Sequence, residues 1–87
     1  MVNDKGNKMY EEIFAWNWIM DGKFVKAKYL GGFDVFGKVV NSRVAYGGGL
    51  RYTIELETPI EVFGRTADTV IVRSEEITNV YRVKKVA

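Results

Sequence analysis

The sequence predicts a small, mainly β domain with one helix at its N-terminal end. From Lys23 onward, apolar and polar residues alternate in short runs, which is the two-residue period of half-buried strands. Glycine-rich stretches separate these runs and suit tight turns. The 87 residues contain no repeat, low-complexity tract or linker, and this length suits one domain. We therefore expect a flexible tail over residues 1–7 and a single domain over residues 8–87.

The segment 8–21 fits either a helix or a strand. As a helix, it gathers apolar residues on one side: Met9, Ile13, Trp16 and Met20. As a strand, it ends in Asp21-Gly22, a hairpin signal that would set Trp18 opposite Val25. We favour a helix over residues 8–21, because acidic residues in its first turns suit the helix dipole and its Met, Ala and Glu content suits a helix interior.

The rest of the chain predicts a succession of strands. They are expected, with a loop from Gly31 to Gly37 and a helical turn capped by Ser74 before the last strand, at residues 23–30, 38–46, 51–57, 69–73 and 80–86. Gly47-Gly48-Gly49 forms the tip of the central hairpin, and Pro59 and Gly64 bracket a longer connection. Two strand faces are clear from the alternation: Val40, Val44 and Tyr46 on one strand, and an inward face of Tyr52, Ile54 and Leu56 on the next.

This order of elements over residues 24–83 resembles the SH3-like small β-barrel superfamily. The similarity lies in a strand, a loop, a long hairpin, a short strand (Thr69-Val70-Ile71-Val72) and one helical turn (Glu75-Glu76-Ile77) before a final strand. It implies a five-stranded antiparallel barrel, to which the N-terminal helix is an addition. Members of this class bind peptides, nucleic acids or larger assemblies, and few catalyse a reaction alone. The resemblance therefore implies a small accessory binding module, a type that bacterial viruses also encode.

The composition argues against most enzyme chemistry. The chain has no His and no Cys, so it lacks the usual general base near neutral pH, the commonest metal ligands and thiol nucleophiles. Glu55 and Glu57 share a strand face that Asp34 or Glu61 could approach, a pattern that can hydrolyse glycosides or hold a cation. Alternating Glu residues are more typical of a solvated hairpin face. We expect no catalysis, no cofactor and no metal.

The start of the chain has no signal-peptide pattern, and no apolar run approaches the ~20 residues that cross a bilayer. The sequence therefore predicts a cytoplasmic protein that does not bind membranes.

Two sets of residues are candidates for binding. The first would contact another protein or a second copy of the chain, because aromatic side chains often dominate interfaces; it consists of Tyr10, Phe14, Trp16 and Trp18. In a helix Trp16 and Trp18 point in different directions, so we expect at least one of them to be partly exposed. The alternative is nucleic-acid binding through basic strand faces, using Lys26, Lys28, Lys38, Arg43 and Arg51. A net charge of +2 permits this alternative without favouring it.

Overall fold

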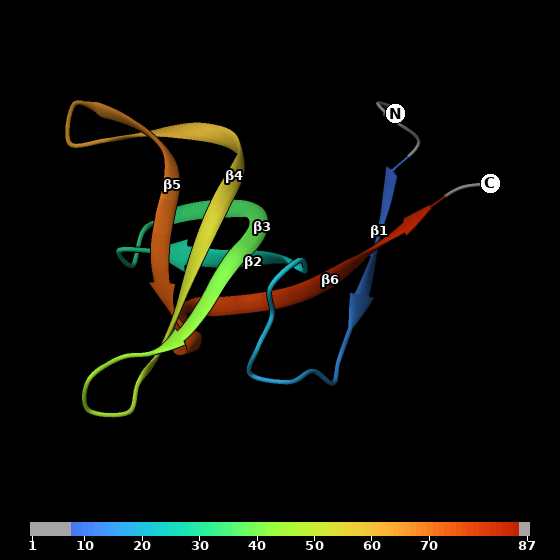
Figure 1. Ribbon diagram of the computed structural model, residues 1–87. Coiled ribbons are helices and arrows are strands. Elements are labelled where there is room, and N and C mark those ends of the chain that lie inside the picture. Colours follow the sequence, from blue (N-terminus) through green and yellow to red (C-terminus); the bar gives the residue numbers. More distant parts are fainter. Residues whose placement is uncertain (1–7, 86–87) are drawn as a thin grey trace.

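The computed structural model describes residues 8–85, which form six strands and one short 3-10 helix (Figure 1). In chain order these elements are β1 (Lys8–Ile13), β2 (Phe24–Tyr29), β3 (Phe33–Val44), β4 (Leu50–Val62), β5 (Arg65–Arg73), η2 (Ser74–Glu76) and β6 (Ile77–Lys85). The strands form one antiparallel sheet in the order β1-β6-β2-β3-β4-β5. The expected tail over residues 1–7 lies outside the described residues.

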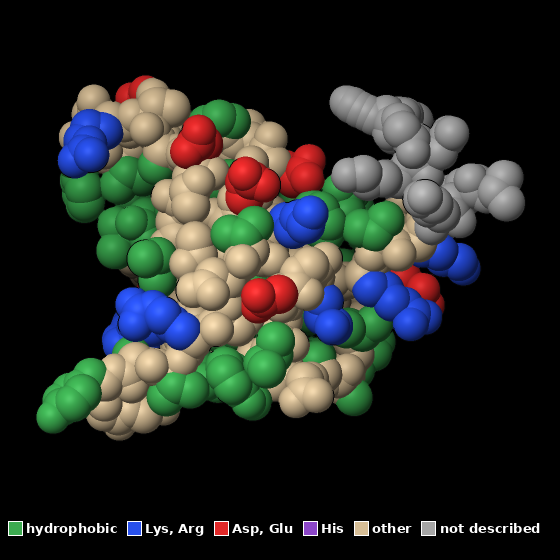
Figure 2. All heavy atoms as spheres, viewed as in Figure 1, with side chains coloured by type: hydrophobic (Ala, Val, Ile, Leu, Met, Phe, Trp, Pro, Cys, Tyr) green, Lys and Arg blue, Asp and Glu red, His purple; other side chains and the backbone are tan. Residues whose placement is uncertain are grey.

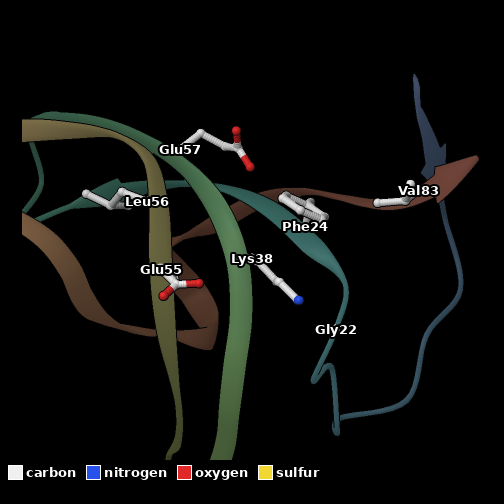
Figure 3. Close-up of a pocket in the computed structure, with 7 residues that line it drawn as sticks. All are labelled: Gly22, Phe24, Lys38, Glu55, Leu56, Glu57 and Val83. Carbon is white, nitrogen blue, oxygen red and sulfur yellow. The ribbon is translucent and has the colours of Figure 1, made fainter. Parts of the chain in front are cut away.

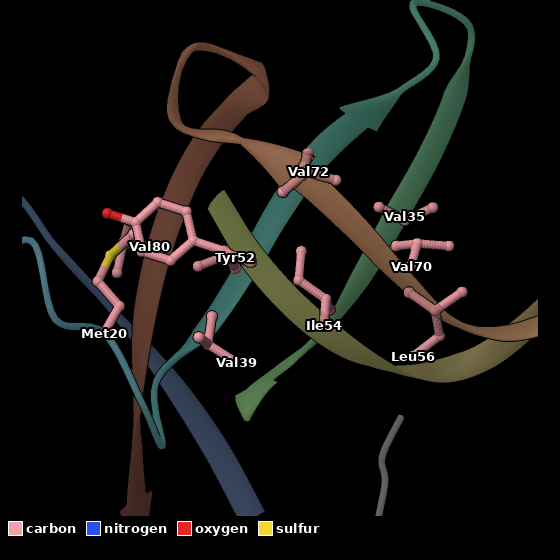
Figure 4. Packing of buried hydrophobic residues seen from close by; sticks show 11 residues of the cluster. Met20, Val35, Val39, Tyr52, Ile54, Leu56, Val70, Val72 and Val80 are labelled. Carbon is pink, nitrogen blue, oxygen red and sulfur yellow. The ribbon is translucent and has the colours of Figure 1, made fainter. Parts of the chain in front are cut away.

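The core lies on the inner face of this bent sheet. The predicted inward face of β4 is confirmed, because Tyr52, Ile54 and Leu56 are all buried. They pack with buried residues of β2, β3, β5 and β6, and with Met20 from the segment before β2 (Figure 4). The alternation along each strand places apolar side chains on this face and most charged side chains on the other, outer face. The inner face thus supplies most of the hydrophobic stabilisation.

The predicted five-stranded barrel is wrong. The sheet has six strands, and no backbone ladder joins its edge strands β1 and β5 within the described residues, so it is not closed. The extra strand causes the difference, because β6 pairs with β2 near its start and with β1 along the rest of its length. In Figure 1, β6 begins at the lower end of β5 and runs across the molecule to β1.

The predicted helix over residues 8–21 is also wrong, because its first part is β1. In the extended conformation, Tyr10 packs against Phe24 and Phe36 on the outer face, with ring centroids 4.8 and 5.1 Å apart. Ile13, on the opposite face of the strand, packs against the core. Both faces of the strand therefore contact apolar residues, and these tertiary contacts outweigh the local preference for a helix.

Residues 14–23 form neither a helix nor the alternative hairpin strand. They run as an irregular connection with a turn at Asp21-Gly22, and they do not pair with β2. The edge of β2 that such a hairpin would need is occupied by β6. Gly22 adopts a φ of 90°, and its N–H donates to the carbonyl of Val39 at 2.7 Å. The turn that the sequence predicts is present, but it docks on β3 instead of joining two paired strands.

The predicted loop from Gly31 to Gly37 is shorter than expected, because β3 already begins at Phe33. The register between β3 and β4 shifts at Val40, which is exposed, while Val39 beside it is fully buried. This bulge breaks the simple alternation, so Val40 does not share a regular face with Val44 and Tyr46.

Two residues in the hairpins reflect how tightly the sheet bends. A Cβ atom on Gly37 would collide with the backbone of Glu55 and Leu56, so only glycine fits where β3 crosses β4. Pro59 lies within β4, where a connection was expected, at a point where the ladder to β5 is interrupted between Glu55 and Ile60. A proline has no N–H to donate, so this gap accommodates it.

Among the described residues, none belongs to a helix of the length and apolarity needed to cross a membrane.

Candidate binding surfaces

The connection before β2 is fixed to the sheet by one buried side chain and a set of hydrogen bonds. Met20 is only 2% exposed and belongs to the core, and its N–H donates to Oγ of Ser42 at 2.9 Å. The Ser42 hydroxyl donates in turn to Oδ1 of Asp21 at 2.6 Å. The Tyr52 hydroxyl donates to the carbonyl oxygen of Trp18 at 2.7 Å, and burial raises the pKa of this phenol. These contacts hold the backbone of residues 18–21 in one place.

This anchoring leaves the aromatic side chains of the connection outside the core. Trp16 and Trp18 are 47% and 42% exposed, and Phe14 and Ile19 are more exposed still. We call these four residues the Trp surface. Beside it lies a hollow of about 250 Å³, the Trp hollow, lined by Trp16, Trp18, Met20, Leu50, Tyr52, Ser74 and Ile77. In Figure 2, hydrophobic side chains lie along the lower rim of the molecule, from the tip of the β3–β4 hairpin toward the connection before β2.

The expectation that at least one tryptophan is partly exposed is met by both, but the helix argument behind it was wrong. An irregular connection, not the wide apolar arc of a helix, presents Trp16 and Trp18. Tyr10 does not join them, because it lies on β1 against Phe24. Burial and the nearby carboxylate of Glu57 raise the pKa of the Tyr10 phenol. The structure therefore retains Phe14, Trp16 and Trp18 as one exposed segment and assigns Tyr10 to the packing of the outer face.

The predicted basic residues separate into two groups, of which the lysines of β2 and β3 form the first. Lys28 Nζ lies 2.8 Å from Oδ1 of Asp34 and lowers the pKa of that carboxyl group. Lys38 is directly opposite Glu55 in the β3–β4 ladder. Lys26 is exposed on the same outer face of the sheet. Lys26 also contributes to the lowered pKa of Asp34, so each of these three lysines has a carboxylate nearby.

The outer face also has the larger polar hollow, of about 430 Å³, shown in Figure 3. Its lining residues come from four strands and the turn before β2: Gly22, Phe24, Lys38, Glu55, Leu56, Glu57 and Val83. Asp34 pairs with Lys28, and Glu61 accepts a hydrogen bond from Thr66 at 2.9 Å. Within residues 8–85, no three acidic side chains come close enough to hold a metal ion.

The second basic group is a row of arginines across three strands. Arg51 of β4 is directly opposite both Arg43 of β3 and Arg73 of β5. The neighbouring Tyr52 points into the core, so alternation places all three arginines on the outer face. We call Arg43, Arg51 and Arg73 the arginine row. It lies near the glycine tip of the β3–β4 hairpin, on the opposite side of the sheet from the Trp hollow.

The members of the arginine row differ in how their charges are compensated. Arg73 contacts the carboxylates of Glu75 and Glu76 at 3.8 and 3.7 Å. Arg51 Nη1 donates to the carbonyl oxygen of Leu50 at 3.3 Å. Neither Arg43 nor Arg51 forms an ion pair with a carboxylate of the described residues. The uncompensated positive charge of the row is therefore concentrated on β3 and β4.

Sequence reasoning missed three of the residues that complete these surfaces. Leu50 and Ile77 line the Trp hollow, and Arg73 extends the arginine row. Arg73 could be placed only with the β4–β5 register, which the interruption at Pro59 conceals. Ile77 follows η2. The residue that precedes η2 is Arg73, whose N–H donates to the Glu76 carboxylate at 2.7 Å, and the predicted cap Ser74 lies within η2 instead. No local pattern brings Ile77 to a tryptophan.

No protein-family model matches this chain, and neither the curated proteins nor the solved structures give a significant match.

Proposed function

We propose that this protein is a non-catalytic binding module that holds another protein through the Trp surface. In this proposal the partner inserts an apolar side chain into the Trp hollow and packs against Trp16 and Trp18. The observation that carries the proposal is the exposure of two tryptophans and Phe14 on one anchored segment of an 87-residue chain. Neighbouring exposed aromatic residues of this kind mark interaction sites on soluble proteins.

The rigid support of the segment favours binding. Because Met20 is buried and Tyr52 holds the Trp18 carbonyl, the backbone beside the hollow is already ordered before a partner arrives. A preorganised site avoids much of the entropy cost of ordering a loop on association. The hollow of about 250 Å³ is also large enough to receive a side chain. These features support an anchor-and-pocket contact.

The chemistry of the chain supports a role without catalysis. The sequence has no His and no Cys, which are common general bases, metal ligands and nucleophiles. In the polar hollow, the Glu55 and Glu57 carboxylates lie with Lys38, which offsets part of their charge. The Trp hollow, by contrast, is lined mainly by apolar side chains. Binding through apolar contact is the activity that these groups suit best.

The proposal is tested by comparing capture of proteins from a native-host lysate by the wild-type chain and by Trp16→Ala and Trp18→Ala variants. Phe63→Ala is the matched control, because Phe63 is an exposed aromatic residue at the β4–β5 turn, away from the Trp surface. We expect one stoichiometric protein with the wild type and with the control. With the purified partner, each Trp variant should bind ~30-fold more weakly, the loss of about 2 kcal/mol typical of a hot spot.

Quenching of tryptophan fluorescence by acrylamide identifies the occupant. In single-Trp variants, each ring should be accessible in the free monomer and protected in the complex. Equal capture by the wild type and both Trp variants would contradict the proposal. Protection that rises with the chain's own concentration, together with a dimer in light scattering, would show that a second copy covers the Trp surface instead of another protein.

A further inference from the structure

The arginine row places like charges side by side on the outer face of the hairpin. Residues directly opposite each other in an antiparallel pair have Cβ atoms about 5 Å apart, and like charges in such pairs destabilise a sheet. Arg51 has an arginine opposite it on both neighbouring strands. Glu75 and Glu76 compensate Arg73, but no carboxylate of the described residues pairs with Arg43 or Arg51. A bound anion would compensate this charge.

The hairpin tip beside the row presents further features suited to such a ligand. A Cβ atom on Gly49 would lie 2.9 Å from Arg51 Nη1, so the guanidinium lies directly over this glycine. Tyr46, in the turn three residues after Arg43, is fully exposed. Gly47 and Gly48, which follow it, have φ values of 96° and 98° that favour glycine. Guanidinium groups bind phosphates through paired hydrogen bonds, and an exposed aromatic ring can stack on a base.

We propose that Arg43, Arg51 and Tyr46 form a site for single-stranded nucleic acid across the tip of the β3–β4 hairpin. The two guanidinium groups contact consecutive phosphates, and the Tyr46 ring stacks on a neighbouring base. The strand crosses the hairpin at the row and does not follow the whole outer face, because Glu55 and Glu57 farther along β4 repel phosphate. This site is separate from the Trp hollow, which lies on the inner side of the same strands.

The test measures binding of a fluorescently labelled, mixed-sequence DNA strand of about 10 nucleotides at a series of salt concentrations. Arg43→Gln with Arg51→Gln should weaken binding and reduce the slope of log affinity against log salt by about 0.7 for each lost phosphate contact. Tyr46→Ala should weaken binding at least about fivefold, the lower end of the effect of losing one stacked base, and should leave the salt slope unchanged.

The control is Lys26→Gln with Lys28→Gln, which removes the same charge from the same face but not from the arginine row. This control should keep most of the affinity. Equal losses in the two double variants would overturn the proposal, because net charge alone would then explain binding. The absence of measurable binding at low salt would overturn it as well. Competition by poly-glutamate as strong as competition by unlabelled DNA would also overturn it, because the row would then serve an acidic protein.

Discussion

The two sides of the β3–β4 hairpin present binding surfaces that are held in place in different ways. On the inner side, Met20 in the core and the Tyr52–Trp18 hydrogen bond fix the segment that presents the tryptophans. On the outer side, only the strand register brings Arg43 and Arg51 together, and their charges repel each other. The core thus stabilises the inner surface, whereas repulsion between like charges destabilises the arginine row. Truncating a side chain that anchors the Trp surface should therefore lower the stability of the fold, whereas removing a charge from the arginine row should raise it, most strongly at low salt.

The largest effect is expected from removing Met20, the buried side chain that anchors the Trp surface. Met20→Ala should lower the free energy of unfolding by about 2–5 kcal/mol, because it leaves a cavity in a closely packed core. Where the variant remains folded, it should also expose Trp18 more to acrylamide. Chemical denaturation and quenching measure the two effects.

The matched control for Met20→Ala is Ile19→Ala, one position earlier in the same segment. Ile19 is an exposed member of the Trp surface, so its truncation should change stability by only about 0.5 kcal/mol or less. Equal losses of stability in the two variants would contradict the role of Met20 as the anchor.

A smaller change tests the hydrogen bond that ends on Trp18. Tyr52→Phe removes the hydroxyl that donates to the Trp18 carbonyl and leaves the buried ring in place. The expected loss of stability is about 0.5–1.5 kcal/mol, the net value of one such bond. Quenching should then report a more accessible Trp18, and an unchanged accessibility would show that the bond does not hold the segment.

The same variant should alter the response to alkaline pH. Burial raises the pKa of Tyr52 in the folded state, so below about pH 10 the phenol is neutral in both states and its contribution to stability is complete. Above that pH the unfolded chain ionises first, so stability falls as pH rises through the folded pKa. Tyr52→Phe should reduce this loss without abolishing it, because the pKa of Tyr10 is also raised. Denaturation midpoints on both sides of pH 10 test this.

Sequence reasoning succeeded on the inward face of β4 and failed on residues 8–21. The alternation of Tyr52, Ile54 and Leu56 is local, and one buried face explains it, so the inward side of β4 was predicted correctly. The conformation of residues 8–21 depends on partners far along the chain. β6 pairs with β1, and Phe24 and Phe36 receive Tyr10. No period within the segment contains that information.

The candidate sites show the same limit. The exposure of at least one tryptophan was predicted, but from a helix that the structure does not contain; both rings are exposed because Met20 enters the core and Tyr52 holds the Trp18 carbonyl. The Trp hollow and the arginine row require registers that Val40 and Pro59 disturb, since the bulge and the interrupted ladder each shift the pairing. Basic residues could therefore be proposed from the sequence, but not which of them pair with a carboxylate, as Lys28 does with Asp34 and Arg73 does with Glu75 and Glu76.

The smallest expected effect tests whether charge repulsion within the arginine row destabilises the fold. Arg43→Gln removes one of the like charges opposite Arg51, so it should raise the free energy of unfolding by about 0.2–1 kcal/mol at low ionic strength. The gain should shrink as salt rises from about 0.01 M to about 1 M, because exposed charges are then screened. Arg73→Gln is the comparison, since it also gives up the contacts with Glu75 and Glu76 and should gain less. Urea denaturation of the three proteins at both salt concentrations measures the difference. An Arg43→Gln variant that is less stable than the wild type at low salt would show that Arg43 has a favourable partner, and the charge of the row would then need no ligand to offset it.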